Sequence, residues 1–142
     1  MGWDELTNTR IPDGAIIYGW RGYGQAAVKA AEQGHRFVMT PARIMYLIRY
    51  QGPQWFEPLT YFGNNTLKDV YRYEPIQKEW SPEVRSLLMG VQASMWTEFC
   101  NKPEDVEYQI YNFNAAPSTQ GLQLHSVDIL IAPNTLHRAR NL

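Results

Sequence analysis

The stretch from Ala15 to Pro41 constrains the fold of this chain more than any other. An apolar run rich in β-branched residues, AIIYGW at 15–20, precedes Gly22-Tyr23-Gly24 and the alanine-rich segment QAAVKAAEQG at 25–34. The next segment, RFVMTP at 36–41, is typical of a second short strand that ends at Pro41. This order predicts a strand–helix–strand unit, which almost always makes a right-handed crossover between parallel strands.

The rest of the chain extends this alternation. A third apolar strand is predicted at 88–96, LMGVQASMW, and a helix at 104–113 that places Val106, Ile110 and Phe113 on one face. The connection over 42–86 is long, and long connections are usually functional. For it we expect a helical turn or two in MYLIRYQ (45–51), a loop in GPQWFEP (52–58), a short helix in TLKDVYRYEP (66–75) ended by Pro75, and a helix with Ser81 as N-cap and Pro82 in its first turn.

The order strand, helix, strand, long connection, strand, helix indicates an α/β fold with a parallel sheet and helices outside it. Functional residues of such folds gather at the carboxyl ends of the strands. In this sequence those ends are Trp20-Arg21-Gly22, Thr40-Pro41 and Trp96-Thr97-Glu98. Near the C-terminus, VDILIA at 127–132 is read as a lone strand.

Charge and composition exclude several kinds of partner. The net charge is −1, so no basic surplus indicates nucleic-acid binding, and no apolar run approaches the roughly 20 residues of a membrane span. The single Cys100 excludes an internal disulfide framework. His35, His125 and His137 lie far apart without metal-ligand spacing, so we expect neither a metal site nor a cofactor.

Aromatic residues are unusually frequent, with 5 Trp, 9 Tyr and 5 Phe. They bury large areas, so a well-filled core accounts for them on general grounds. The other interpretation is a surface that stacks on sugar rings, whose axial C–H faces are apolar while their rims carry hydroxyls. Tryptophan beside a carboxylate suits that mixed chemistry.

A nucleotide-binding function is one alternative. Gly22-x-Gly24-x-x-Ala27 follows a strand and opens a helix, as in the dinucleotide fingerprint with alanine as its third small residue. The acid expected after the following strand is absent, because that strand ends Met39-Thr40-Pro41. The pattern alone is therefore weak support.

The strongest local motif is MGVQASMWTEF at 89–99. A buried strand that ends in Trp-x-Glu places the flat face of Trp96 and the carboxylate of Glu98 two residues apart on one side of the strand. The simpler explanation is a core tryptophan followed by a solvated glutamate. Both interpretations are open for this pair taken alone.

Five motifs taken together resemble a known family. They are WDE at 3–5, WRG at 20–22, GHRFVMTP at 34–41 with Tyr46-Leu47 shortly after, GVQASMWTEF at 90–99, and EYQIY at 107–111. Their order and spacing resemble the second half of the barrel of the family 20 glycoside hydrolases, the β-N-acetylhexosaminidases. The resemblance covers residues 1–111. It implies a partial (β/α)8 TIM barrel, roughly strands five to eight with their helices.

The resemblance also implies roles for five residues. Trp3 and Trp20 would enclose the acetamido group of a terminal N-acetylhexosamine. Trp96 would lie under the sugar ring, and Glu98 would accept hydrogen bonds from the sugar hydroxyls. Tyr46 matches the tyrosine whose hydroxyl supports the acetamido carbonyl.

The family's mechanism explains why a tyrosine is needed at this place. The substrate's acetamide oxygen attacks the anomeric carbon and gives an oxazolinium intermediate, an exception to the usual two-carboxylate scheme. A tyrosine O–H aimed at that oxygen fixes the reactive orientation. The family's catalytic Asp-Glu pair follows strand four, and because the resemblance begins just before the strand-five tryptophan, we expect neither that strand nor the pair in this chain. Asp4 and Glu5 are instead expected to orient their loop and cap the next segment.

The chain departs from the family in two places. Ile48 stands where the family commonly has an aspartate that bonds sugar hydroxyls, which leaves the gluco or galacto preference open. After EYQIY the family's usual continuation does not appear. We therefore expect two parts: residues 1–116 as the C-terminal part of a family 20 catalytic barrel, and residues 117–142 as a divergent tail.

The resemblance leads to a functional expectation for the whole protein. It would hydrolyse terminal non-reducing N-acetylhexosamine residues from glycans and be secreted, periplasmic or surface-associated. This chain would be a fragment that supplies pocket walls and no acid catalyst, with the rest of the barrel or a second copy as its partner. The alternative is a non-catalytic carbohydrate-binding or interaction domain on the same scaffold.

Overall fold

A four-stranded parallel sheet forms the centre of the computed structural model, which describes residues 1–111, 127–129 and 139–141. The strand order is β1-β2-β3-β6, with all neighbours parallel. The strands are short: β1 spans Gly2–Trp3, β2 Ile17–Gly19, β3 Phe37–Met39 and β6 Leu88–Val91. The predicted α/β fold with a parallel sheet is therefore confirmed.

Helix α1 (Gln25–Ala31) connects β2 to β3 and packs against both strands. Its alanines lie directly on the sheet because their small side chains allow close approach. The helix α3 (Pro82–Leu87), with Ser81 as N-cap and proline in its first turn as predicted, leads into β6. Together these elements enclose the main core: Ile11, Ile17, Ala27, Ala30, Ala31, Phe37, Met39 and Val84.

The turn before α1 depends on two glycines in the left-handed region. Gly22 has φ +57° and Gly24 has φ +83°. A Cβ on Gly24 would lie 2.7 Å from Cε of Met39 and 3.0 Å from the carbonyl oxygen of Gly19. The glycine that resembled a nucleotide fingerprint thus allows the turn to pack against β2 and β3.

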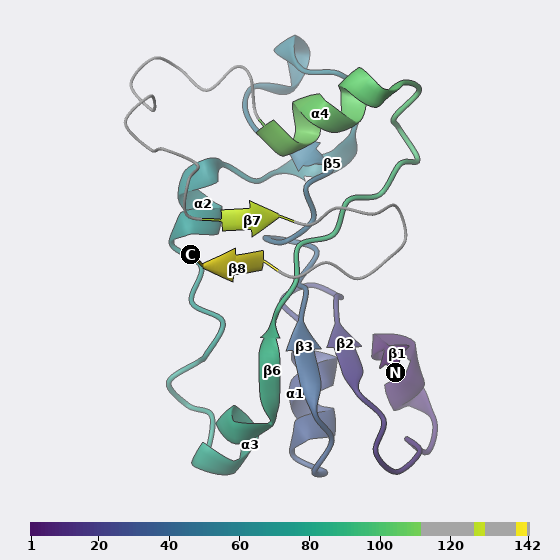
Figure 1. Cartoon of the computed structure of the whole chain (residues 1–142), viewed down its shortest axis with the longest axis vertical. Coiled ribbons are helices and arrows are strands. Elements are labelled where there is room, and N and C mark those ends of the chain that lie inside the picture. The colour runs from purple at the N-terminus through teal and green to yellow at the C-terminus, as the bar shows by residue number, and fades with distance from the viewer. Residues whose placement is uncertain (112–126, 130–138, 142) are drawn as a thin grey trace.

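The first part of the connection, residues 42–71, lies beyond the carboxyl ends of the central strands, and the chain then runs back to their other end, where it forms α3 (Figure 1). This first part contains β4 (Arg49–Tyr50), the 3-10 helix η2 (Gln54–Phe56), β5 (Tyr61–Asn64) and α2 (Leu67–Tyr71). The helical turn expected in MYLIRYQ is wrong: Tyr46 makes a parallel bridge to Ser94, and β4 pairs with β5. The helix expected from 66 to 75 is shorter, with Thr66 and Asp69 forming a capping box at its start.

The strand predicted over 88–96 is also shorter than expected. It ends at Val91, and the chain then leaves the sheet to form the single bridge at Ser94. Helix α4 (Pro103–Tyr111) agrees with the prediction for its first part, although Gln109 is more buried than either Val106 or Ile110. Phe113 lies outside the described residues.

Near the C-terminus, β7 (Val127–Ile129) pairs antiparallel with β8 (Ala139–Asn141). The strand expected at 127–132 therefore has a partner and is not alone. The proposed boundary at 116/117 lies outside the described residues. Among the helices that the structure describes, none is long and apolar enough to cross a membrane.

Candidate functional site

The carboxyl ends of the central strands converge on one open cavity of about 390 Å³. This volume lies within the range of roughly 300–1,000 Å³ that is usual for small-molecule sites. We call it the aromatic pocket. Its lining residues come from β1, the end of β2, the connection and the segment after β6: Trp3, Glu5, Trp20, Tyr46, Ile48, Tyr61, Trp96 and Glu98.

All five residues predicted to bind substrate therefore line the same cavity. Trp3 ends β1, and Trp20 follows β2 directly. Thr40, which also follows a strand, does not line the cavity: it is fully buried, and its hydroxyl lies 3.0 Å from that of Ser94. The rule that directs attention to strand ends found the pocket but did not distinguish lining residues from supporting ones.

Asp4 and Glu5 position the Trp20 side of the pocket. Asp4 is fully buried, and its two carboxylate oxygens accept hydrogen bonds from the backbone N–H groups of Trp20 (3.0 Å) and Arg21 (2.9 Å). Asp4 was expected to orient its own loop, and its carboxylate instead holds the turn that follows β2. The prediction of a cap is wrong, because no side-chain hydrogen bond caps the 3-10 helix η1 (Asp4–Asn8).

Burial raises the pKa of the Asp4 carboxyl, although the two backbone hydrogen bonds act in the opposite direction. Glu5 lies at the rim of the pocket instead. It accepts a hydrogen bond from Nε1 of Trp20 at 3.2 Å and forms a salt bridge with Arg21 at 2.8 Å. Burial raises the pKa of the Glu5 carboxyl, but hydrogen bonds from its own backbone N–H, from Arg21 and from Trp20, with the charge of Arg21, together lower the pKa below its usual value. The two adjacent acids thus hold the backbone and the indole of Trp20 respectively.

Four aromatic rings form a continuous wall. Trp20 stacks on Tyr46, with ring centroids 6.2 Å apart and planes at 13°. Tyr46 contacts Trp96 at 5.7 Å, and Trp96 contacts Trp3 at 5.9 Å, both in tilted geometry. Such pairs stabilise one another beyond their area burial. The wall is therefore pre-formed without a ligand.

The backbone of the Tyr46 segment holds this wall in register with the segment after β6. Ser94 donates its N–H to the Met45 carbonyl at 2.8 Å, and Leu47 donates to the Ser94 carbonyl at 3.0 Å. The bridge supports Trp96 two residues later. Trp96 and Glu98 thus reach the pocket from a loop, and the strand geometry predicted for them is wrong.

The Tyr46 hydroxyl has an unusually protected environment. Burial raises its pKa well above the usual value, and the negative charges of Asp4 and Glu5 act in the same direction. The nearby Nε1–H of Trp96 lowers the pKa of Tyr46, but this effect is smaller than that of burial. The Trp96 N–H makes no hydrogen bond of good geometry to any described residue. Tyr46 thus stays protonated and able to donate a hydrogen bond at neutral pH.

Two lining residues change the character of one side of the pocket. Ile48 is almost fully buried. It offers an apolar surface at the position where, by the resemblance, an aspartate is common. Tyr61, at the start of β5, was missed by the sequence analysis. The high aromatic content of residues 55–62 was the available signal, but without the unexpected β4–β5 pairing nothing placed Tyr61 beside Tyr46.

This arrangement suits a ligand that is apolar on its faces and polar on its rim. The aromatic wall offers flat apolar surface, and Glu98 offers an acceptor at the edge. Tyr46 and Trp96 offer buried donors. Among the described residues, no group of three histidine, cysteine or acidic side chains converges as a metal site.

The fold and the pocket define a segment of a parallel α/β domain with an aromatic, acid-edged cavity at its strand ends. Residues 1–118 match the glycosyl hydrolase family 20 catalytic domain. The chain belongs to this family.

Relatives and solved structures agree with this assignment. The chain is 34% identical over 112 residues to a beta-hexosaminidase of Porphyromonas gingivalis, covering 78% of this chain and 14% of that protein. It is 31% identical over 126 residues to a beta-hexosaminidase of Vibrio furnissii, covering 86% and 20%. The chain thus spans a fifth or less of the length of these relatives.

The solved structures are also matched over part of their length. A Vibrio harveyi exo beta-N-acetylglucosaminidase in complex with N-acetylglucosamine superimposes with a TM-score of 0.60 at 28% identity, over 78% of this chain and 18% of that chain. A mutant Streptomyces plicatus beta-hexosaminidase in complex with the product GlcNAc gives a TM-score of 0.65 at 23% identity, over 78% and 23%, and supports the fold alone.

Proposed function

We propose that this chain is the C-terminal half of a β-N-acetylhexosaminidase barrel and forms one side of its sugar pocket. The observation that carries the proposal is the convergence of Trp3, Trp20, Tyr46, Trp96 and Glu98 on one cavity. In this proposal β1, β2, β3 and β6 are strands five to eight of the barrel. The remainder of the barrel is then the natural partner of the open sheet edges at β1 and β6.

The side chains have distinct roles in the proposed pocket. Trp96 lies under the sugar ring and Glu98 accepts hydrogen bonds from its hydroxyls. Trp3 and Trp20 enclose the acetamido group, and the protonated hydroxyl of Tyr46 donates to its carbonyl oxygen. That donation holds the oxygen in position for attack on the anomeric carbon, the intramolecular step of a substrate-assisted retaining mechanism.

The acid that protonates the leaving group is not supplied by this chain in our proposal. Asp4 is fully buried under two backbone hydrogen bonds, and Glu5 is held by Trp20 and Arg21. Neither carboxylate is placed to transfer a proton to a leaving group. We therefore expect the isolated chain to bind a sugar weakly and not to hydrolyse it.

Two measurements test the proposal. The first is the release of chromophore from a chromogenic N-acetylglucosaminide, and we expect the isolated chain to release none. If contaminating enzyme is excluded and turnover survives both Glu98→Gln and Asp4→Asn, catalysis does not need this site. The second is a titration with N-acetylglucosamine and with glucose, followed by tryptophan fluorescence.

Tyr46→Phe and Tyr71→Phe form a matched pair for the second measurement, because both remove one hydroxyl and retain every tryptophan. Tyr71 is 79% exposed and lies outside the pocket. Loss of one hydrogen bond lowers affinity by about threefold to tenfold. We expect that loss for N-acetylglucosamine with Tyr46→Phe alone. Equal affinity of the chain for glucose and N-acetylglucosamine would favour a general carbohydrate-binding domain over the proposed acetamido site.

A further inference from the structure

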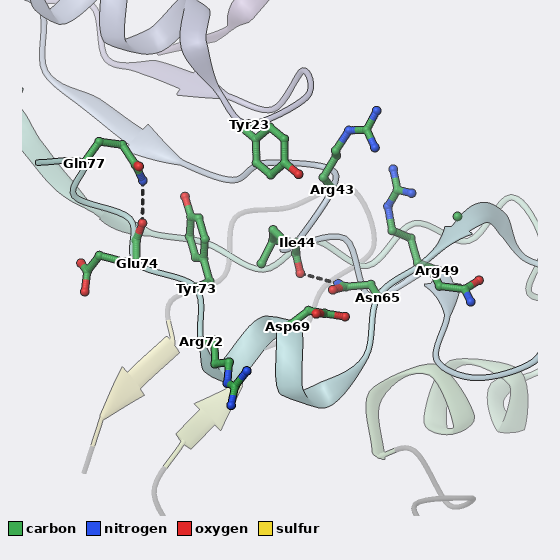
Figure 2. Close-up of a pocket in the computed structure, with 12 residues that line it drawn as sticks. Tyr23, Arg43, Ile44, Arg49, Asn65, Asp69, Arg72, Tyr73, Glu74 and Gln77 are labelled. Carbon is green, nitrogen blue, oxygen red and sulfur yellow. Dashed lines mark hydrogen bonds between the residues drawn. The ribbon is translucent and has the colours of Figure 1, made fainter. Parts of the chain in front are cut away.

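A second and larger cavity of about 640 Å³ lies on the connection between β3 and β6 (Figure 2). It opens between the turn before α1, the segment around Ile44, β5, and α2 with the chain that follows it. In Figure 2 Tyr23 and Arg43 lie across the cavity from α2, which contains Asp69 and is followed directly by Arg72. None of its lining residues belongs to the aromatic pocket. We call it the arginine cavity.

Three guanidinium groups line this cavity, from Arg43, Arg49 and Arg72, against two carboxylates, from Asp69 and Glu74. Three positive charges and two negative ones leave one net positive charge. Asp69 is already used locally, since its Oδ2 accepts hydrogen bonds from the N–H and hydroxyl of Thr66 at 2.9 and 2.6 Å. Within the described part of the chain, neither Arg43 nor Arg72 has a carboxylate within 4.0 Å.

Backbone and ring contacts hold two of the arginines in place. Arg49 donates from Nε to the carbonyl oxygen of Ala42 and lies over the ring of Tyr61, 5.5 Å from its centroid. Gly63 lacks a Cβ at the place where Nη1 of Arg49 lies. Arg43 lies 5.9 Å from the ring centroid of Tyr23. Positioned guanidinium groups of this kind are the usual means of recognising planar or tetrahedral oxyanions.

Two buried polar atoms at the cavity have no partner among the described residues: Oδ1 of Asn65 and the hydroxyl of Tyr73. Asn65 is 7% exposed, and its orientation is set because its Nδ2 donates to the Ile44 carbonyl at 2.5 Å. Its free atom is therefore an acceptor. Buried polar groups without partners are costly, so a donor from beyond these described residues, such as a ligand hydroxyl, would complement them.

The geometry points to a binding site for an acidic sugar, a molecule that carries both an oxyanion and hydroxyl groups. We propose that Arg43 and Arg49 receive the oxyanion, while Asn65 and Tyr73 bond the hydroxyls. The oxyanion is the carboxylate of a uronic acid or the sulfate or phosphate ester of a neutral sugar. The site is separate from the aromatic pocket and does not depend on the function proposed for it.

Calorimetric titration of the chain with glucuronate, glucose and inorganic sulfate, at matched ionic strength, tests this proposal. Glucuronate carries both the oxyanion and the hydroxyl groups of the proposed ligand. Glucose carries only the hydroxyl groups, and sulfate carries only the oxyanion. We expect glucuronate to bind at least tenfold more tightly than glucose or sulfate and to weaken as salt is added. Sulfate binding as tightly as glucuronate would overturn the proposed role of Asn65 and Tyr73.

Matched variants locate the binding. Arg43→Gln is expected to weaken glucuronate binding about tenfold, and Tyr73→Phe about threefold. The controls, Arg10→Gln and Tyr71→Phe, remove the same groups from exposed positions outside the cavity and should leave affinity unchanged, with circular dichroism confirming the fold of each variant. Unchanged affinity in both test variants would overturn the proposal. So would a loss caused by Tyr46→Phe, which would place glucuronate in the aromatic pocket.

Discussion

Replacing Asp4 by alanine should destabilise the chain because two backbone donors lose their acceptors at once. The N–H groups of Trp20 and Arg21 donate to separate oxygens of this fully buried carboxylate, across 16 and 17 residues of sequence. A buried donor left without a partner costs about 1–3 kcal/mol. Both donors are partly buried, so water restores part of this loss, and removal of a buried charge returns a further part. We expect a net loss of about 2–3 kcal/mol in the free energy of unfolding.

Urea unfolding followed by tryptophan fluorescence measures this loss, with Asp13→Ala as the control. Asp13 is exposed in a turn, and its replacement should change stability by less than about 0.5 kcal/mol. The same titration reports on Trp20, whose position depends on the Asp4 hydrogen bonds. An Asp4→Ala variant as stable as Asp13→Ala would refute the conclusion that Asp4 joins β1 to the end of β2.

The loss should also depend on pH. Burial raises the folded-state pKa of Asp4 above 3.8, so the folded state binds its proton more tightly than the unfolded state. The stability contributed by Asp4 is therefore complete below about pH 3.8 and decreases as the pH rises through the raised pKa. The difference between the chain and Asp4→Ala should be larger at about pH 4 than at about pH 7. A difference that grows with pH would contradict the direction of this shift.

Three further substitutions give distinct outcomes. Glu5→Gln breaks an exposed salt bridge to Arg21, so the free energy of unfolding should change by less than about 1 kcal/mol. The tryptophan fluorescence of the chain should shift, because the indole of Trp20 loses a charged acceptor. Gly24→Ala should destabilise by about 1–3 kcal/mol, because φ is +83° and the new Cβ meets Met39; a stability change below 0.5 kcal/mol would contradict the close approach. Ser81→Ala should cost about 1 kcal/mol in thermal unfolding through loss of the N-cap of α3, and Ser86→Ala serves as its control.

The sequence was sufficient to predict those parts of the fold that have strong local patterns. The alanine-rich helix, the apolar strands on either side of it and the N-cap at Ser81 all depend on residues close together in the chain. The convergence of Trp3 and Trp20 also followed, because parallel strands bring their carboxyl ends to one edge, whereas Trp96 reaches the pocket from the loop after β6. The roles of those side chains toward a sugar remain predictions.

The parts that sequence analysis missed depend on contacts between distant segments. β4 has two residues and β5 has four, too few for any alternation to stand out, and each is a strand because the other pairs with it. The bridge between Tyr46 and Ser94 joins residues that are 48 positions apart in the sequence. The environment of Asp4 is also non-local. A carboxylate next to a tryptophan suggests a surface acid until the backbone of residues 20 and 21 is placed over it.

The bridge between Tyr46 and Ser94 has a mechanical consequence for the aromatic pocket. Two backbone hydrogen bonds hold the Tyr46 segment to Ser94, and Trp96 follows two residues later. These bonds fix the spacing between the backbone segments that carry Tyr46 and Trp96. On the other side of the pocket, the Asp4 carboxylate holds the backbone of Trp20 at 3.0 Å, and Ala42 donates to the Trp20 carbonyl at 2.7 Å. The spacing of the four rings, and so the width of ligand that fits between them, is therefore set by backbone contacts.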